Sequence, residues 1–225
     1  MIEQRFIAGI RFLWTKPNDS MGPANGAIVA STGVANNLTY DGLDGHKAAV
    51  SNALLTGAPI GMAMGTNVPH AWLDYAPGRT SRLQIGVNDI LTGYMSGCLI
   101  IRGTHSGAMS AFHVGTIVGN AAVNKKVKDS FARDLPADAT GFNPAGAWNP
   151  GEIANKQIAL GGGTVATPNI LALVTTTGAF YSVLMFNVLD GGSWTNPAGI
   201  RYWCVGGIKQ VPAINRVGLM ASLMS

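Results

Sequence analysis

Glycine residues divide almost the whole chain into short apolar segments. Glycine accounts for 30 of the 225 residues, nearly twice the share of about 7% that is typical of proteins. Because glycine adopts the backbone conformations that tight turns require, this pattern predicts many short strands joined by turns. The segment 180–188 is almost continuously apolar, so we expect it in a sheet that is covered on both faces. The expected strands are residues 26–34, 59–64, 98–101, 108–114, 169–176, 180–188, 200–205 and 216–223.

Fewer segments favour helices. Residues 120–134 predict one, because an N-cap asparagine precedes apolar residues at intervals of four. These residues are Asn120, Val123, Val127, Phe131 and Leu135. A second helix is expected over residues 46–55 and a short third one over residues 89–94, with Asp89 as its N-cap. Residues 136–151 contain three prolines and are expected to form a surface loop.

The composition indicates a densely folded globular chain. Hydrophobic residues make up 47% and charged residues 12% of the sequence, which excludes a disordered chain. Strands outnumber helices, so we expect an α+β fold with a β-sandwich core flanked by helices, in a single domain over residues 1–225. No apolar run reaches the ~18 residues that a membrane span needs. The N-terminal segment also lacks the pattern of a secretory signal.

The charge pattern does not favour a nucleic-acid partner. The net charge is only +4, and the one cluster of basic residues has no interleaved aromatic residues. This cluster, Lys125, Lys126 and Lys128, is typical of a solvated helix face. The chain also lacks the CxxC and HxxxH spacings of metal sites, so neither a metal nor an organic cofactor is expected.

The sequence LTGYMSGCLII, residues 91–101, places a cysteine at the start of an expected strand. Ser96 and Gly97 form a turn directly before Cys98. A cysteine in this position can direct both its thiol and its backbone N–H into a cleft. That N–H is a candidate donor for an oxyanion on a carbonyl group that the sulfur attacks.

A β-hairpin would bring an imidazole next to this cysteine. If the turn is centred on residues 104–105, Cys98 lies opposite Ala111. His113 is then one diagonal step away on the same face of the sheet, within reach of the Cys98 side chain.

Cys98, His113 and Thr92 have the residue types of a thiol triad. An ordinary thiol is mostly protonated at neutral pH, and an adjacent imidazole can take its proton to produce the nucleophilic thiolate. Thr92 could orient the imidazole through its hydroxyl group or its backbone carbonyl, which is the role of the third residue in a triad.

The same residues also have a structural interpretation. Cysteines in apolar strands are commonly buried as small hydrophobic residues, and Cys98 and His113 would then only fill the core. Thr92 would in that case pack its methyl group inward. Cys204 is expected to be packed and unreactive, and both cysteines are expected to be free thiols, because a chain of this length needs no disulfide.

The segment Thr92-Gly-Tyr-Met-Ser-Gly-Cys98, with His113 fifteen residues after the cysteine, resembles a motif of the glutamine deamidase toxins. That fold is shared by Burkholderia lethal factor, the catalytic domain of cytotoxic necrotizing factor and the chemotaxis-receptor glutamine deamidase. The expected helix after His113 and the late strands, followed by residues 191–203, are similar to the lethal factor in their order. The resemblance assigns the triad to Cys98, His113 and Thr92.

The resemblance implies a cysteine-dependent glutamine deamidase that acts on a protein substrate, without a cofactor and as a monomer. It also implies a bacterial toxin or effector that a dedicated secretion system delivers into the cytoplasm of a host cell, or a domain of a larger toxin. The chemotaxis relative instead acts in the cytoplasm of the producing cell. Two other functions stay open: another Cys-His amidohydrolase such as a cysteine protease, and a non-enzymatic β-sandwich that serves binding or structure.

Overall fold

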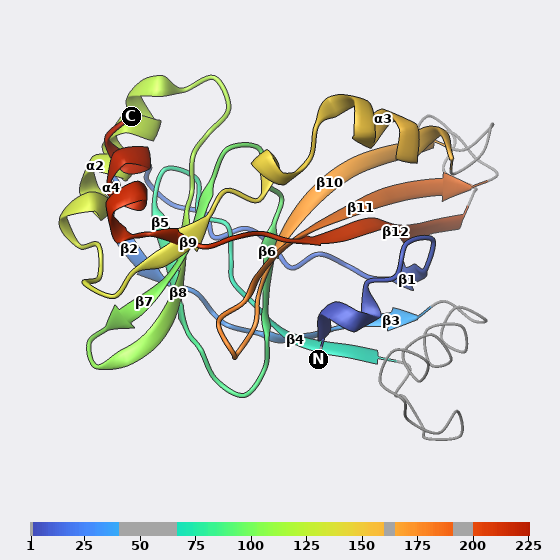
Figure 1. Ribbon diagram of the computed structural model, residues 1–225, viewed down its shortest axis with the longest axis horizontal. Helices are drawn as coiled ribbons and strands as arrows, with labels where there is room; N and C mark the ends of the chain where they lie inside the picture. Colours follow the sequence, from blue (N-terminus) through green and yellow to red (C-terminus); the bar gives the residue numbers. More distant parts are fainter. Residues whose placement is uncertain (1, 41–66, 160–164, 191–199) are drawn as a thin grey trace.

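The computed structural model describes a strand-rich α+β protein with two sheets, which lie side by side along its long axis (Figure 1). The α+β class expected from the sequence is confirmed. The described residues are 2–40, 67–159, 165–190 and 200–225. The helix expected over 46–55, the strand expected over 59–64 and residues 191–199 lie outside them.

One sheet closes into a barrel in the order β1-β12-β11-β10-β6-β4-β3. The short strand β1 closes it, because Phe12 pairs with Trp203 of β12 on one side and with Tyr40 of β3 on the other. The expectation of a β-sandwich is therefore corrected to a barrel with a second sheet beside it. The barrel strands are β1 (Arg11–Leu13), β3 (Ala35–Tyr40), β4 (Asn67–Trp72), β6 (Ile90–Gly93), β10 (Val165–Val174), β11 (Phe180–Asp190) and β12 (Ile200–Gln210).

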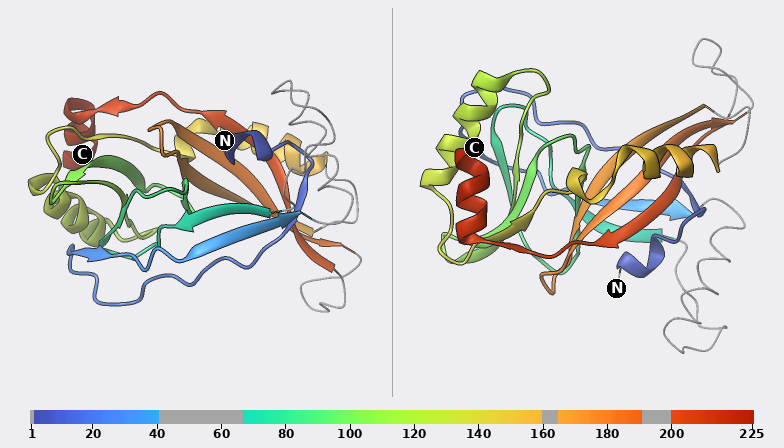
Figure 2. Two further views of the ribbon diagram at one scale, coloured as in Figure 1. Left: turned by 90° about the horizontal axis from the view of Figure 1, so that it is seen from below. Right: turned by 45° about the horizontal axis from the view of Figure 1, so that its top comes forward.

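The second sheet separates a helical layer from the barrel (Figures 1 and 2). On one face, Phe112 packs in a cluster with Phe131 of α2 and Leu219 of α4. On the other face, Ile100 belongs to a cluster with Ile90 of the barrel. The elements are β2 (Ile28–Ala30), β5 (Thr80–Gln84), β7 (Leu99–His105), β8 (Ala108–Val114), β9 (Thr140–Phe142), β13 (Ile214–Asn215), α2 (Ala121–Arg133) and α4 (Arg216–Met224).

The hairpin β7–β8 turns two residues later than the sequence suggests. Its turn residues are Ser106 and Gly107, with φ angles of 51° and 79°, and positive φ at both positions is typical of a type I′ hairpin turn. The resulting register places Ile100 opposite His113. The expected pairing of Cys98 with Ala111 is wrong, but the shift is an even number of residues and leaves each side chain on its expected face.

Local signals predicted one helix correctly and missed two others. Helix α2 begins after Asn120, whose side chain accepts a hydrogen bond from the Val123 N–H, as expected. The segment expected as a strand over 216–223 is instead helix α4, capped by Asn215. Helix α3, Pro150–Ile158, begins at the end of the expected surface loop, where the Asn149 side chain caps it. The short helix expected over 89–94 is instead strand β6.

Strand β11 is covered on both faces, as its apolar sequence predicted. Val183 and Met185 point into the barrel core. Leu184 and Phe186 alternate with them and pack against Trp148 on the outside, beside helix α3 (Figure 1). The alternation follows from the two-residue period of a strand.

Candidate active site

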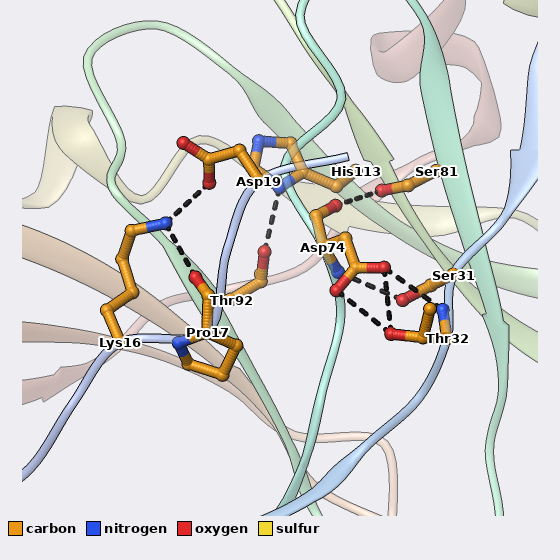
Figure 3. Close-up of polar contacts among 9 residues, drawn as sticks. All are labelled: Lys16, Pro17, Asp19, Ser31, Thr32, Asp74, Ser81, Thr92 and His113. Carbon is orange, nitrogen blue, oxygen red and sulfur yellow. Dashed lines mark hydrogen bonds and ion pairs between the residues drawn. The ribbon is translucent and has the colours of Figure 1, made fainter. Parts of the chain in front are cut away.

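A hydrogen bond between the two sheets forms the centre of the candidate site. Thr92 lies on barrel strand β6 and His113 on β8 of the second sheet, and both are fully buried. The Thr92 Oγ1 atom lies 2.7 Å from Nδ1 of His113 (Figure 3). Of the two Thr92 groups considered from the sequence, the hydroxyl group is therefore the one that contacts the imidazole, and it does so from a strand rather than a helix.

The other ring nitrogen of His113, Nε2, is buried. Among the described residues it has no hydrogen-bond partner. When Nδ1 carries the ring proton and donates it to Thr92, Nε2 keeps a free lone pair and can act as a base.

Cys98 lies on the same face of the sheet as His113. It directly precedes strand β7, and the register makes it a diagonal neighbour of His113. Its side chain shares a cluster with Ile100 and Ala111, which occupy that face. Among the described residues no hydrogen bond joins Cys98 to His113 directly. The structure thus places Cys98 and His113 on one face of the sheet, and the Thr92 hydroxyl group contacts the imidazole.

The thiol lies behind the wall of a surface hollow. Cys98 is only 1% exposed, and its Sγ atom lies 3.4 Å from the Oγ1 atom of Thr116. Ser96, Gly97 and Thr116 line a hollow of about 270 Å³, which Lys128 of α2 borders on the other side. The turn expected before Cys98 therefore forms part of this wall.

Burial keeps both reactive groups neutral. It raises the pKa of the Cys98 thiol above its ordinary value and lowers the pKa of His113 to about 3, with a smaller contribution from the positive charge of Lys16. A preformed thiolate–imidazolium pair is therefore disfavoured at neutral pH. This protonation state suits a reaction in which the thiol proton moves to His113 only when a substrate binds.

The loop after β4 holds a tyrosine against the site. The ring centroids of Tyr75 and His113 lie 5.3 Å apart, and the Tyr75 hydroxyl donates a 2.6 Å hydrogen bond to the Thr116 carbonyl. The preceding residue anchors the loop, because the Asp74 carboxylate accepts hydrogen bonds from the backbone N–H and hydroxyl of Thr32 (Figure 3).

A segment after β1 crosses the same region. Lys16 forms an ion pair with Asp19 and donates a 3.0 Å hydrogen bond to the Pro17 carbonyl (Figure 3). The N–H of Ser20 donates to the carbonyl of Tyr75. The contact between Ser20 and Tyr75 attaches the segment to the loop after β4.

Sequence reasoning missed Thr116, Tyr75 and Lys16. A signal for Thr116 was present, because a hairpin centred on Ser106 and Gly107 places the end of β8 beside Cys98. Tyr75 and Lys16 come from loops far from the motif, and their spacing contains no comparable signal.

The described part of the chain offers no cluster of three or more His, Cys, Asp or Glu residues that could hold a metal ion. None of the helices described is long and apolar enough to cross a membrane. The two cysteines form no disulfide bond with each other, as expected. Cys204 is buried, as expected, and Cys98 is buried as well, which is what the structural interpretation of the motif predicts.

Comparisons with known proteins identify no relative. No protein-family model, curated protein or solved structure matches the chain.

Proposed function

We propose that this chain is a cysteine-dependent glutamine deamidase that acts on a protein substrate. The observation that carries the proposal is the buried 2.7 Å contact between Thr92 Oγ1 and His113 Nδ1. It orients the Nε2 atom, which has no hydrogen-bond partner in the described part of the chain, on the face of the sheet that also carries Cys98. Support also comes from the Thr92-to-Cys98 motif, which resembles that of the deamidase toxins and suggests their fold for this chain.

In the proposed reaction, His113 Nε2 takes the proton of the Cys98 thiol as the sulfur attacks the carboxamide carbon of a glutamine. The resulting oxyanion accepts a hydrogen bond from the Cys98 N–H. His113 returns the proton to the leaving nitrogen, so that ammonia departs and a thioester remains. His113 then takes a proton from water as the water oxygen attacks the thioester, and it returns this proton to the leaving Cys98 sulfur. The thiol is regenerated, and the glutamine has become a glutamic acid side chain, which ionises in water.

The reaction needs no metal or organic cofactor, since every proton moves through His113. Its product gains a carboxylate, and this new negative charge can disable a glutamine that positions water or binds a partner. We propose a host cytosolic protein as the target and delivery by a dedicated secretion system. These two points are supported only by the resemblance to toxins.

Mass spectrometry of a host-cell lysate tests this function. Lysate is incubated with the wild-type chain, with the Cys98→Ser variant and with Cys204→Ser as a matched cysteine control. We expect conversion of one glutamine to glutamate in one protein with the wild type and with Cys204→Ser, and none with Cys98→Ser.

Other outcomes of this experiment would overturn the proposal. Cleavage of a peptide bond that depends on Cys98 would identify a protease. Identical lysates for all three proteins would favour the non-enzymatic binding or structural protein. Deamidation by Cys98→Ser at the wild-type rate would exclude the thiol mechanism.

Thr92→Ala is expected to lower ammonia release by about 10- to 100-fold, because His113 loses the hydroxyl group that fixes its ring and its tautomer. Thr92→Ser keeps the hydroxyl group and should retain most of the activity. The rates are measured on the identified substrate with a coupled ammonia assay. Equal rates for the alanine and serine variants would remove the Thr92 hydroxyl from the mechanism.

A further inference from the structure

Thr116 makes the closest polar contact of the Cys98 sulfur. Its Oγ1 atom lies 3.4 Å from Sγ, and its backbone carbonyl lies 4.0 Å from Sγ. Thr116 is 9% exposed and also lines the hollow in front of the thiol. It therefore lies between the sulfur and the space from which a small molecule or side chain can approach.

The backbone around Thr116 is held from several sides. The Tyr75 hydroxyl donates to the Thr116 carbonyl at 2.6 Å. The preceding Gly115 donates to the carbonyl of Arg79 at 2.9 Å and accepts from the N–H of Gly78 at 2.7 Å. With its backbone fixed in this way, Thr116 keeps its hydroxyl group within reach of the thiol.

The hydroxyl group can serve both states of the sulfur. While Cys98 is a thiol, the S–H group can donate to Thr116 oxygen atoms. Once the proton has left, the hydroxyl group can donate to the sulfur, and its hydrogen bond then favours the thiolate, together with smaller contributions from the backbone of Thr116 and Gly97. This effect counters the burial that raises the pKa of Cys98.

We propose that Thr116 is a fourth member of the site, whose hydroxyl group donates a hydrogen bond to the Cys98 thiolate and whose position is fixed by Tyr75. The stabilisation of the thiolate does not depend on which reaction the protein catalyses. Its use in deamidation rests on the function proposed above.

Alkylation of Cys98 by iodoacetamide measures this effect without any substrate. The thiolate attacks the methylene carbon and displaces iodide, so the rate follows the thiolate fraction. The experiment uses the Cys204→Ser background, in which Cys98 is the one remaining cysteine. The rate is followed by intact mass across a range of pH, for otherwise unchanged protein and for Thr116→Val, Thr116→Ser and Tyr75→Phe.

We expect Thr116→Val to move the midpoint of the pH–rate profile upward by about one pH unit, which is about a tenfold lower rate at a fixed lower pH. Thr116→Ser should keep the original midpoint, and Tyr75→Phe should move it upward by less. The midpoint is the decisive quantity because a change in access to the thiol alters the rate at every pH alike.

The other titratable groups around the thiol are unchanged in the threonine variants. Among the described residues these are His113 on β8, Tyr75 on its loop, Lys128 across the hollow, and the pair Lys16 and Asp19 beyond Tyr75. A shift of the midpoint that Thr116→Val shows and Thr116→Ser does not show is therefore due to the loss of the hydroxyl group.

An unchanged midpoint in a folded Thr116→Val variant would overturn the proposal. If the valine variant does not fold, as judged by circular dichroism, Tyr75→Phe provides the test, and an unchanged midpoint in that variant overturns it. A shifted midpoint without deamidation of any lysate protein supports the role of Thr116 and contradicts the proposed function. Deamidation of a lysate protein together with an unchanged midpoint supports the proposed function and contradicts the role of Thr116.

Discussion

Replacing His113 by glutamine is expected to lower ammonia release by about 1000-fold, because the variant lacks the group that accepts and returns the proton of Cys98 in the proposed reaction. Glutamine is polar and can still hydrogen-bond to Thr92, so the variant should keep the fold. The rate is measured with the substrate found in the lysate experiment.

His70 provides a matched control for this substitution. It is also a fully buried histidine, and its Nδ1 atom lies 3.1 Å from the Val68 carbonyl. Its Nε2 atom likewise has no hydrogen-bond partner among the residues that the structure describes. Burial lowers the pKa of His70 to about 4. Because His70 lies on barrel strand β4 and not beside Cys98, His70→Gln should retain activity. Equal losses in the two variants would show that only folding had been affected.

The pH dependence of the free energy of unfolding provides an independent check on the buried, neutral His113 side chain. The pKa of His113 is about 3 in the folded chain and near 6.5 in the unfolded chain, so the unfolded chain binds more protons between these pH values. Stability therefore falls as the pH is lowered from about 6.5 toward 3. His113 should contribute about 2 kcal/mol to this loss at pH 5, and the glutamine variant should lose that much less in urea denaturation.

Gly115→Ala is expected to lower the free energy of unfolding by about 3 kcal/mol, because the new methyl group has no space and the surrounding atoms belong to the backbone. An added Cβ atom would lie 2.2 Å from the carbonyl oxygen of Ala76 and 2.9 Å from that of Arg79. These atoms belong to the loop that follows Tyr75, so relief of the clash should also displace Thr116.

Gly86→Ala is the matched control for this prediction. An added Cβ atom at Gly86 would meet nothing within 4 Å, so its effect should stay within about 0.5 kcal/mol. Urea denaturation of both variants measures the difference. Similar stabilities would mean that the loop moves freely away from β8.

Short-range signals were reliable where they do not depend on distant contacts. Helix α2 was predicted because its N-cap residue and its apolar stripe lie within one segment. Strand β11 was predicted to be covered on both faces from its continuous apolar sequence alone. In contrast, β6 is only four residues long and buried throughout, and such a short apolar segment has no period that separates a strand from a helix.

Closure of the barrel could not be derived from local sequence. Arg11 of β1 pairs with Cys204 of β12, and nothing in the three residues of β1 indicates a partner so distant along the chain. The nine residues of α4 posed a similar problem. Leu219 and Leu223 are buried there at helical spacing, but the segment is too short for apolar content to decide its type.

The sequence by itself indicated the candidate site residues, because Thr92 and Cys98 belong to one motif and His113 to the hairpin that follows it. Tertiary structure decided how they meet: the contact between Thr92 and His113 joins two sheets, and Thr116 reaches the sulfur only in the true register of β7 and β8. It also decided the charge of the site. Burial between the sheets removes water from Cys98 and His113, and that desolvation keeps both groups neutral.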